Sequence, residues 1–172
     1  MHHRIALILL TITTGAAPAA EEMPAAKPAC AAEVAPSGAL APWSSPAAVT
    51  AGSEPAKAPP LTAGKAASVT LLPTPDVHYG LRPEKPGGSV SYGGLLGLDV
   101  AQAGTYRIAL STAAWIDLAG KDGALRSVAH GHGPDCTGIR KMVDYVVPAG
   151  HYTLQISANG TPRINVLAVA EK

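Results

Sequence analysis

The sequence of 172 residues contains no phenylalanine, and its only aromatic residues are two tryptophans and five tyrosines. A hydrophobic core therefore has to be built on Leu, Ile and Val with a few Tyr, because rings are too scarce to fill it. Charged residues make up only 15% of the chain, and the formal net charge is +1. With so little net charge, the chain lacks the excess of positive charge that attracts nucleic acid or an anionic membrane surface, so neither is expected as a partner.

Long apolar runs are also missing, which excludes a membrane span because a spanning helix needs about 20 apolar residues. A short apolar run does occupy residues 5–12, after a basic start at residues 2–4 and before an A-x-A site at residues 17–19. This order is typical of a secretory signal peptide, here cleaved after Ala19. We therefore expect residues 1–19 to be removed and the mature chain to be periplasmic or secreted.

Cysteine is scarce too, with Cys30 and Cys136 as the only two. In an oxidising compartment, an even number in a small exported chain most simply indicates a disulfide. A bridge that closes so long a loop would stabilise the fold by up to about 4 to 5 kcal/mol and would pin the N-terminal segment to the domain. A free thiol or a metal ligand at Cys136 is the alternative.

Proline is concentrated in residues 20–65, which are rich in alanine and hold half of the sixteen prolines of the chain. Proline removes a backbone donor and fixes φ, so neither a helix nor a strand is expected to extend far in this segment. We predict a disordered, semi-extended Pro/Ala-rich arm or linker, with Trp43 as a packed anchor where it docks on the domain.

From residue 66 the pattern changes to short strands separated by turns. Two segments, residues 100–110 and 146–156, share the motif Ala-Gly-x-Tyr-x-aliphatic, in which glycine can supply the positive φ of a tight turn. The alternation after each glycine places every second side chain on one face of a strand. The buried faces predicted in this way consist of Tyr106, Ile108 and Leu110, and of Tyr152, Leu154 and Ile156.

No segment shows a 3.6-residue period of helical length, whereas eight or nine short strands can be traced over residues 66–172. The pairs Asp122-Gly123 and Asn159-Gly160 add two hairpin signals. Many short strands separated by turns are typical of an all-β fold, here an antiparallel β-sandwich of jelly-roll-like type.

The loop at residues 129–136 carries His130, His132 and Asp135 among glycines. Histidines two residues apart on a flexible loop can converge on iron or zinc, and a carboxylate can complete the set. A shaped surface turn is the simpler interpretation of a loop rich in Gly, Pro and Asp.

A second group of residues combines flat rings with hydrogen-bonding groups, a mixture suited to holding sugars or peptides. Trp115 is central to it, although a large aromatic residue is also a common component of a core. The candidate ligand-binding residues are Trp115, Asp117, Tyr92, Tyr145, Arg107 and Arg140.

The two Ala-Gly-x-Tyr strands, together with Trp-Ile-Asp-Leu at 115–118, resemble the pre-peptidase C-terminal type of β-sandwich found in secreted bacterial proteins. The resemblance covers residues 89–170 and implies a jelly-roll-like accessory module without a catalytic residue. The chain as a whole is also similar to a group of short exported bacterial proteins, some of which carry the name homogentisate 1,2-dioxygenase. The similarity includes Ser-Tyr-Gly-Gly-Leu-Leu at residues 91–96 and the histidine loop at residues 130–141. That resemblance implies an iron-dependent enzyme, yet this chain has no cupin motif onto which the ligands of homogentisate dioxygenases can be placed.

These observations favour a noncatalytic exported module that binds a saccharide, a peptide or another envelope component and needs no cofactor. The alternative is an enzyme that uses iron or zinc in the loop from His130 to Cys136.

Overall fold

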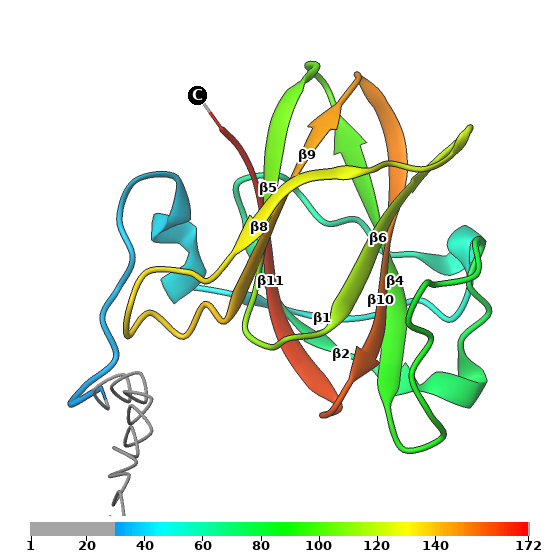
Figure 1. Ribbon diagram of the computed structural model, residues 1–172, viewed down its shortest axis with the longest axis horizontal. Helices are drawn as coiled ribbons and strands as arrows, with labels where there is room; N and C mark the ends of the chain where they lie inside the picture. Colours follow the sequence, from blue (N-terminus) through cyan, green and yellow to red (C-terminus); the bar gives the residue numbers. More distant parts are fainter. Residues whose placement is uncertain (1–29, 172) are drawn as a thin grey trace, which may run out of the picture.

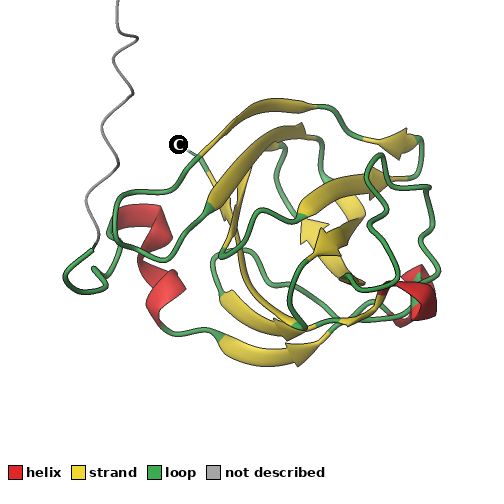
Figure 2. Cartoon of the chain, turned by 60° about the horizontal axis from the view of Figure 1, so that its bottom comes forward, coloured by secondary structure: helices red, strands yellow, loops and turns green. Residues whose placement is uncertain are grey.

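A computed structural model describes residues 30–171 of the chain, which form two β-sheets packed face to face (Figure 1). Three short 3₁₀ helices lie at the periphery of the two sheets (Figure 2). Every pair of adjacent strands is antiparallel except β1 with β2. The antiparallel β-sandwich predicted from the sequence is confirmed, while the predicted signal peptide and residues 20–29 of the arm lie outside the described residues.

The two sheets contain eleven strands. In spatial order, the six-stranded sheet consists of β1 (Ala47–Thr50), β2 (Ala66–Thr70), β11 (Arg163–Ala170), β5 (Gly104–Leu110), β9 (Lys141–Val147) and β8 (Ser127–Gly131). The five-stranded sheet consists of β3 (Leu72–Pro73), β4 (Tyr92–Val100), β10 (Gly150–Asn159), β6 (Trp115–Gly120) and β7 (Gly123–Ala124). The 3₁₀ helices are η1 (Gly38–Ser44), η2 (Pro55–Lys57) and η3 (Thr74–Asp76). Within residues 30–171, no helix is long and apolar enough to cross a membrane.

The hydrophobic core lies between the sheets and confirms the two buried faces predicted from the alternation. The side chains on β5 and β10 that were assigned to the interior are all buried there. As the lack of phenylalanine requires, the core is aliphatic, and its only buried rings belong to three tyrosines. They are Tyr106, Tyr145 and Tyr152.

The repeated Ala-Gly-x-Tyr motif marks the two corners where the chain crosses from one sheet to the other, between β4 and β5 and between β9 and β10. The hydroxyl of Tyr106 donates to the carbonyl of Gln102 (3.2 Å), and that of Tyr152 donates to the carbonyl of Pro148 (3.0 Å). Each ring thus reaches back four residues and ties its corner to the following strand, as tyrosine corners do in other β-sandwiches.

The positive φ expected for the glycines of these motifs is found in one of the two. Gly150 has a φ of 158°, whereas Gly104 has no positive φ. The hydrogen bond of the tyrosine hydroxyl, in contrast, is present at both corners.

Replacing Tyr152 by phenylalanine is expected to lower the free energy of unfolding by about 1 kcal/mol, because the carbonyl of Pro148 loses its donor. Urea denaturation measures the change. The control is Tyr92→Phe, since the hydroxyl of Tyr92 makes no hydrogen bond within the described residues and its loss should change stability by less than about 0.5 kcal/mol. Equal losses in the two variants would show that the corner bond contributes nothing.

The Asp122-Gly123 hairpin is confirmed. β6 pairs with β7 antiparallel, with Gly120 opposite Gly123, and Gly123 has a φ of 115° that favours glycine. The two residues between the paired glycines therefore form the tip of the hairpin.

The hairpin predicted at Asn159-Gly160 is wrong, because β10 and β11 belong to different sheets. The buried side chain of Asn159 stabilises a crossing instead. Its amide donates to the carbonyl of Thr161 (2.6 Å), and its Oδ1 accepts from Thr112 (2.6 Å). Asn-Gly thus supplies turn chemistry here without specifying which strand the chain pairs with next.

The described part of the Pro/Ala-rich segment packs on the sandwich, which differs from the disordered arm expected for it. Residues 47–50 form β1 at the edge of the six-stranded sheet, and Ala51 and Leu61 are buried in the core. The prolines permit this because Pro46 immediately precedes β1 and none interrupts it, and because an edge strand pairs on one side only. The sandwich therefore begins before residue 66.

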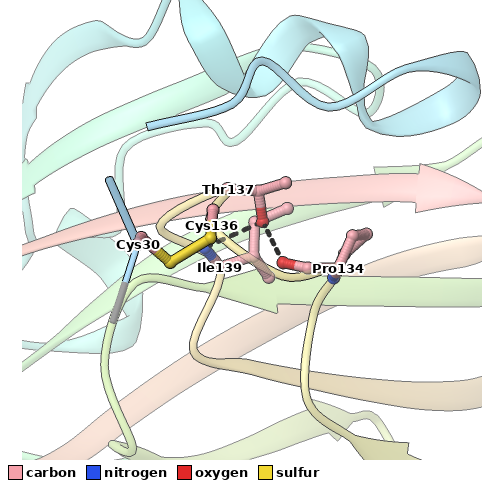
Figure 3. The surroundings of a disulfide bond; sticks show 5 residues. All are labelled: Cys30, Pro134, Cys136, Thr137 and Ile139. Carbon is pink, nitrogen blue, oxygen red and sulfur yellow. Dashed lines mark hydrogen bonds between the residues drawn. A yellow bond between two sulfur atoms is a disulfide. The ribbon is translucent and has the colours of Figure 1, made fainter. Parts of the chain in front are cut away.

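The predicted disulfide between Cys30 and Cys136 is confirmed and pins the N-terminal segment to the loop between β8 and β9 (Figure 3). The Cα atoms are 5.5 Å apart, which is ordinary for a disulfide. The amide of Val34 donates to the carbonyl of Cys136 (2.7 Å), and the hydroxyl of Thr137 donates to the carbonyl of Pro134 (2.8 Å) and so stiffens the loop.

η1 covers the outer face of the six-stranded sheet. Trp43 is only 4% exposed there, which confirms its expected role as a packed anchor. Its hydrophobic cluster is separate from the main core and consists of Trp43, Ala66, Ala109, Ile139, Leu167 and Val169, with Leu40 and Met142 at its margin.

Candidate functional site

The site lies at one side of the sandwich, where β6 of the five-stranded sheet approaches β9 and β8 of the six-stranded sheet. An open groove of about 490 Å³ occupies this position. We call it the lateral groove, and its lining includes Trp115, Asp117, Tyr145, Arg126, Ser127 and Glu84. A cavity of about 230 Å³ adjoins it and shares Trp115, Ser127 and Tyr145, adding Lys141 and His130.

The alternation of β6 explains why Trp115 and Asp117 lie in the groove. Ile116 and Leu118 point into the core, so the residues between and beside them face outward. Trp115 is therefore partly exposed and absent from both hydrophobic clusters, which decides against the core interpretation of this residue.

The long loop between η3 and β4 forms the second wall. Gln155 on β10 exchanges two hydrogen bonds with the backbone of Leu81 (3.0 and 3.1 Å), and Ser157 donates to the carbonyl of Lys85 (2.8 Å). Both side chains are buried, so they hold the loop firmly against the outer face of the five-stranded sheet. This attachment brings the ammonium of Lys85 to 5.2 Å from the ring centroid of Trp115.

Asp117 is the most unusual polar group of the site. Its Oδ1 accepts a hydrogen bond from the indole N–H of Trp115 (3.1 Å), whereas its Oδ2 is buried without a hydrogen-bond partner. Burial raises the pKa of Asp117, and the negative charge of Glu84 adds to the increase, while the bond from Trp115 and the charge of Lys141 oppose it. A buried oxygen without a donor is rare in folded proteins, because leaving it unsatisfied costs about 1–3 kcal/mol.

Two lysines flank the ring of Trp115. The ammonium of Lys141 is 5.3 Å from the ring centroid and donates to the carbonyl of Ala114 (2.9 Å). Burial lowers the pKa of Lys141, and the positive charge of Lys85 lowers it further. Both contacts lie within the range of cation–π attraction.

Two tyrosines complete the surroundings of Asp117. The hydroxyl of Tyr145 donates to the carbonyl of Ile116 (3.3 Å), and burial, with the charge of Asp117, raises its pKa. The same two causes raise the pKa of Tyr79 to about 12. Both phenols therefore remain protonated at neutral pH and act as hydrogen-bond donors.

Three of the six predicted ligand-binding residues, Trp115, Asp117 and Tyr145, are brought together in the lateral groove. Arg107 lies elsewhere, on the outer face of the six-stranded sheet, where it makes two 2.8 Å bonds to Asp144 and a 3.1 Å contact with Glu171.

The other two predicted binding residues also lie outside the groove. Tyr92 is at the start of β4, partly buried against the core. Nδ1 of His132 lies 2.6 Å from the guanidinium and 3.0 Å from the carbonyl oxygen of Arg140, so these two residues contact each other outside the groove.

The predicted metal residues do not form a cluster. Among residues 30–171, no group of three or more His, Cys, Asp and Glu side chains lies close enough to hold a metal ion. His130 faces the cavity beside Trp115, whereas Nδ1 of His132 contacts Arg140.

Sequence reasoning missed Lys85, Lys141 and Glu84. Lys141 had a detectable signal, since it continues the alternation of Val143 and Tyr145 on β9 and so had to lie on the same face. The loop that carries Lys85 and Glu84 has no periodicity, and only its tertiary hydrogen bonds place it beside Trp115.

A second cavity, of about 380 Å³, lies beside the β6–β7 hairpin and the corner before β10. The charged groups around it are already paired: Lys121 with Asp122 (2.7 Å) and His151 with Asp99 (2.6 Å). The lateral groove, with its unsatisfied oxygen and partly exposed ring, is therefore the stronger candidate for a ligand site.

Replacing Asp117 by asparagine is expected to raise the free energy of unfolding at neutral pH by about 1 kcal/mol, because the variant removes a charge that is disfavoured by partial burial. The folded-state pKa of Asp117 is raised, so its contribution to stability is present below the ordinary value of 3.8 and is lost as pH rises through the folded value. The gain in the variant should therefore appear near neutral pH and shrink in acid.

Urea denaturation at pH about 7 and at pH about 3 tests this expectation, since the two values bracket the titration of the carboxyl group. Asp76→Asn, at an exposed aspartate of η3, is the control. A gain of the same size at both pH values would contradict the assigned titration.

The chain matches no family model, no curated protein and no solved structure.

Proposed function

We propose that this chain is an exported, noncatalytic binding module and that its lateral groove binds a saccharide. The observation that carries the proposal is the partly exposed ring of Trp115 beside the carboxyl group of Asp117, since both side chains line the groove. An aromatic ring next to a carboxylate offers a sugar an apolar surface for its C–H groups and an acceptor for its O–H groups.

Two features support export. The N-terminal pattern at residues 1–19 is typical of a signal peptide, and a disulfide persists in oxidising compartments such as the periplasm or the extracellular medium. Both are compatible with a role in the cell envelope, where saccharides are abundant.

The polar side chains of the groove favour a saccharide over a peptide. Asp117 on β6, Ser127 at the start of β8 and Arg126 just before it line the groove. A peptide added in extended form to the free edge of β8 would be recognised mainly through main-chain hydrogen bonds and would not require these side chains.

The test is binding of a panel of soluble oligosaccharides, measured by calorimetry and by tryptophan fluorescence. Trp115→Ala is expected to weaken binding at least about tenfold, since loss of a central aromatic contact commonly costs about 2 kcal/mol. Trp43 is buried on the other side of the six-stranded sheet, so a Trp43→Phe variant leaves Trp115 as the only fluorescent reporter. Failure of every saccharide to bind, or unchanged binding by Trp115→Ala, would refute the proposal.

A further inference from the structure

Two lysines, Lys85 and Lys141, lie beside the ring of Trp115, and none of the ion pairs among residues 30–171 includes either of them. Within the same range, other cations such as Lys65 and Arg163 form no ion pair either. What sets these two lysines apart is therefore their position.

The two unpaired lysines share one location. Their ammonium groups lie 5.2 and 5.3 Å from the same ring centroid, that of Trp115, and each repels the other. Lys141 is partly buried as well, so water screens its charge less than it would on the surface. Arg126, which lines the groove and is exposed, adds a third cation.

The acidic groups of the groove offset this positive charge only in part. Burial lowers the pKa of Lys141, the repulsion from Lys85 lowers it further, and the charge of Asp117 raises it by less than Lys85 lowers it. Glu84 lines the groove but forms no ion pair with another described residue. Lys141 lines the adjoining cavity, which shares Trp115 with the groove, so the two cations lie beside the groove at this ring.

We propose that the saccharide bound in the lateral groove is anionic, with an acidic group that lies beside Trp115 and binds Lys85 and Lys141. This inference rests on the proposed function and specifies its ligand. A sugar ring with a carboxylate or sulfate substituent supplies this acidic group together with an apolar face. The shared chemistry is a negatively charged group on a hydroxylated ring.

The experiment compares three short oligosaccharides of equal length by calorimetry, using the full exported chain with its disulfide intact. They are an oligogalacturonate, its neutral galactose counterpart and a sulfated galactose counterpart. We expect at least one acidic oligomer to bind about tenfold more tightly than the neutral one, and the preference to fall as salt rises from about 0.05 M to about 0.5 M. The two acidic arms distinguish a carboxylate from a sulfate.

In the double variant Lys85→Gln/Lys141→Gln, the affinity for the acidic oligomer should fall to that for the neutral one, so that the preference is lost. Lys57→Gln, which removes a lysine of η2 that already has its own carboxylate partner, is the matched control and should retain the preference. Thermal unfolding of all variants confirms that they are folded.

The outcomes separate the two proposals. Equal affinity for neutral and acidic oligomers, with binding still abolished by Trp115→Ala, overturns the anionic ligand and leaves the saccharide module intact. A preference that survives in the double lysine variant also overturns it. Failure of all three oligomers to bind overturns this inference for these sugars, and failure of the wider panel overturns the proposed function.

Discussion

Replacing Cys30 and Cys136 together by serine is expected to lower the free energy of unfolding by about 4 kcal/mol. The two cysteines are 106 residues apart in the sequence, so the bridge restricts most of the described chain in the unfolded state. Loop-closure entropy for a loop of this size is worth about 4 to 5 kcal/mol, and residual structure in the unfolded chain reduces it. Urea denaturation of the variant beside the oxidised wild type measures the difference.

The wild type treated with a reducing agent is the matched control, because it loses the bridge without changing a side chain. It should unfold at the same urea concentration as the double serine variant. If both keep the midpoint of the oxidised protein, the bridge does not stabilise the fold.

Replacing Trp43 by alanine is expected to lower the free energy of unfolding by about 3 to 5 kcal/mol, the range for a buried large aromatic residue. Trp43 is 4% exposed and fills the space between η1 and the outer face of the six-stranded sheet. Its removal leaves a cavity against Ala109 and Leu167, and both of these residues are fully buried. Urea denaturation provides the measurement.

Trp115→Ala is the informative comparison, because the chain contains only these two tryptophans and the second lies in the lateral groove. Its loss should cost clearly less stability than the loss of Trp43, while it removes ligand binding. Should Trp43→Ala prove as stable as Trp115→Ala, the segment that carries η1 would not be an integral part of the fold.

The disulfide and the lateral groove are connected through one loop. Cys136 lies between β8 and β9, and the residues at the two ends of this loop, His130 and Lys141, line the cavity beside Trp115. The bridge thus steadies the loop that leads into Lys141. Binding residues held on strands and braced loops are positioned more precisely than residues on free loops.

The groove itself lowers stability. Asp117 has an unsatisfied buried oxygen, and Lys141 is partly removed from water next to a second positive charge. Local features that disfavour the folded state commonly mark functional sites. This is why Asp117→Asn is expected to stabilise the protein and to weaken binding at the same time.

For several residues of the site, the sequence predicts the strand face on which the side chain lies. Because side chains alternate along a strand, the sequence places Trp115 and Asp117 on the face of β6 opposite Ile116 and Leu118. The sequence could not show whether Arg107 lies in the site, because a charged residue on a strand is equally suited to binding a ligand and to forming an ion pair. Only the register of β5 with β9, which sets Arg107 opposite Asp144, shows that this arginine is used in an ion pair.

The sequence by itself determined the all-β class, the strand faces and the cysteine pair, because these depend on period-two alternation and on residue type. Only the tertiary structure decided which sheet each strand joins, that residues 47–50 belong to the sandwich, and that Lys85 lies over Trp115. The physical reason is the separation along the chain over which each kind of interaction acts. Alternation and turn chemistry act over a few residues, whereas strand pairing and loop attachment depend on contacts between residues far apart in the chain, and no local pattern encodes those contacts.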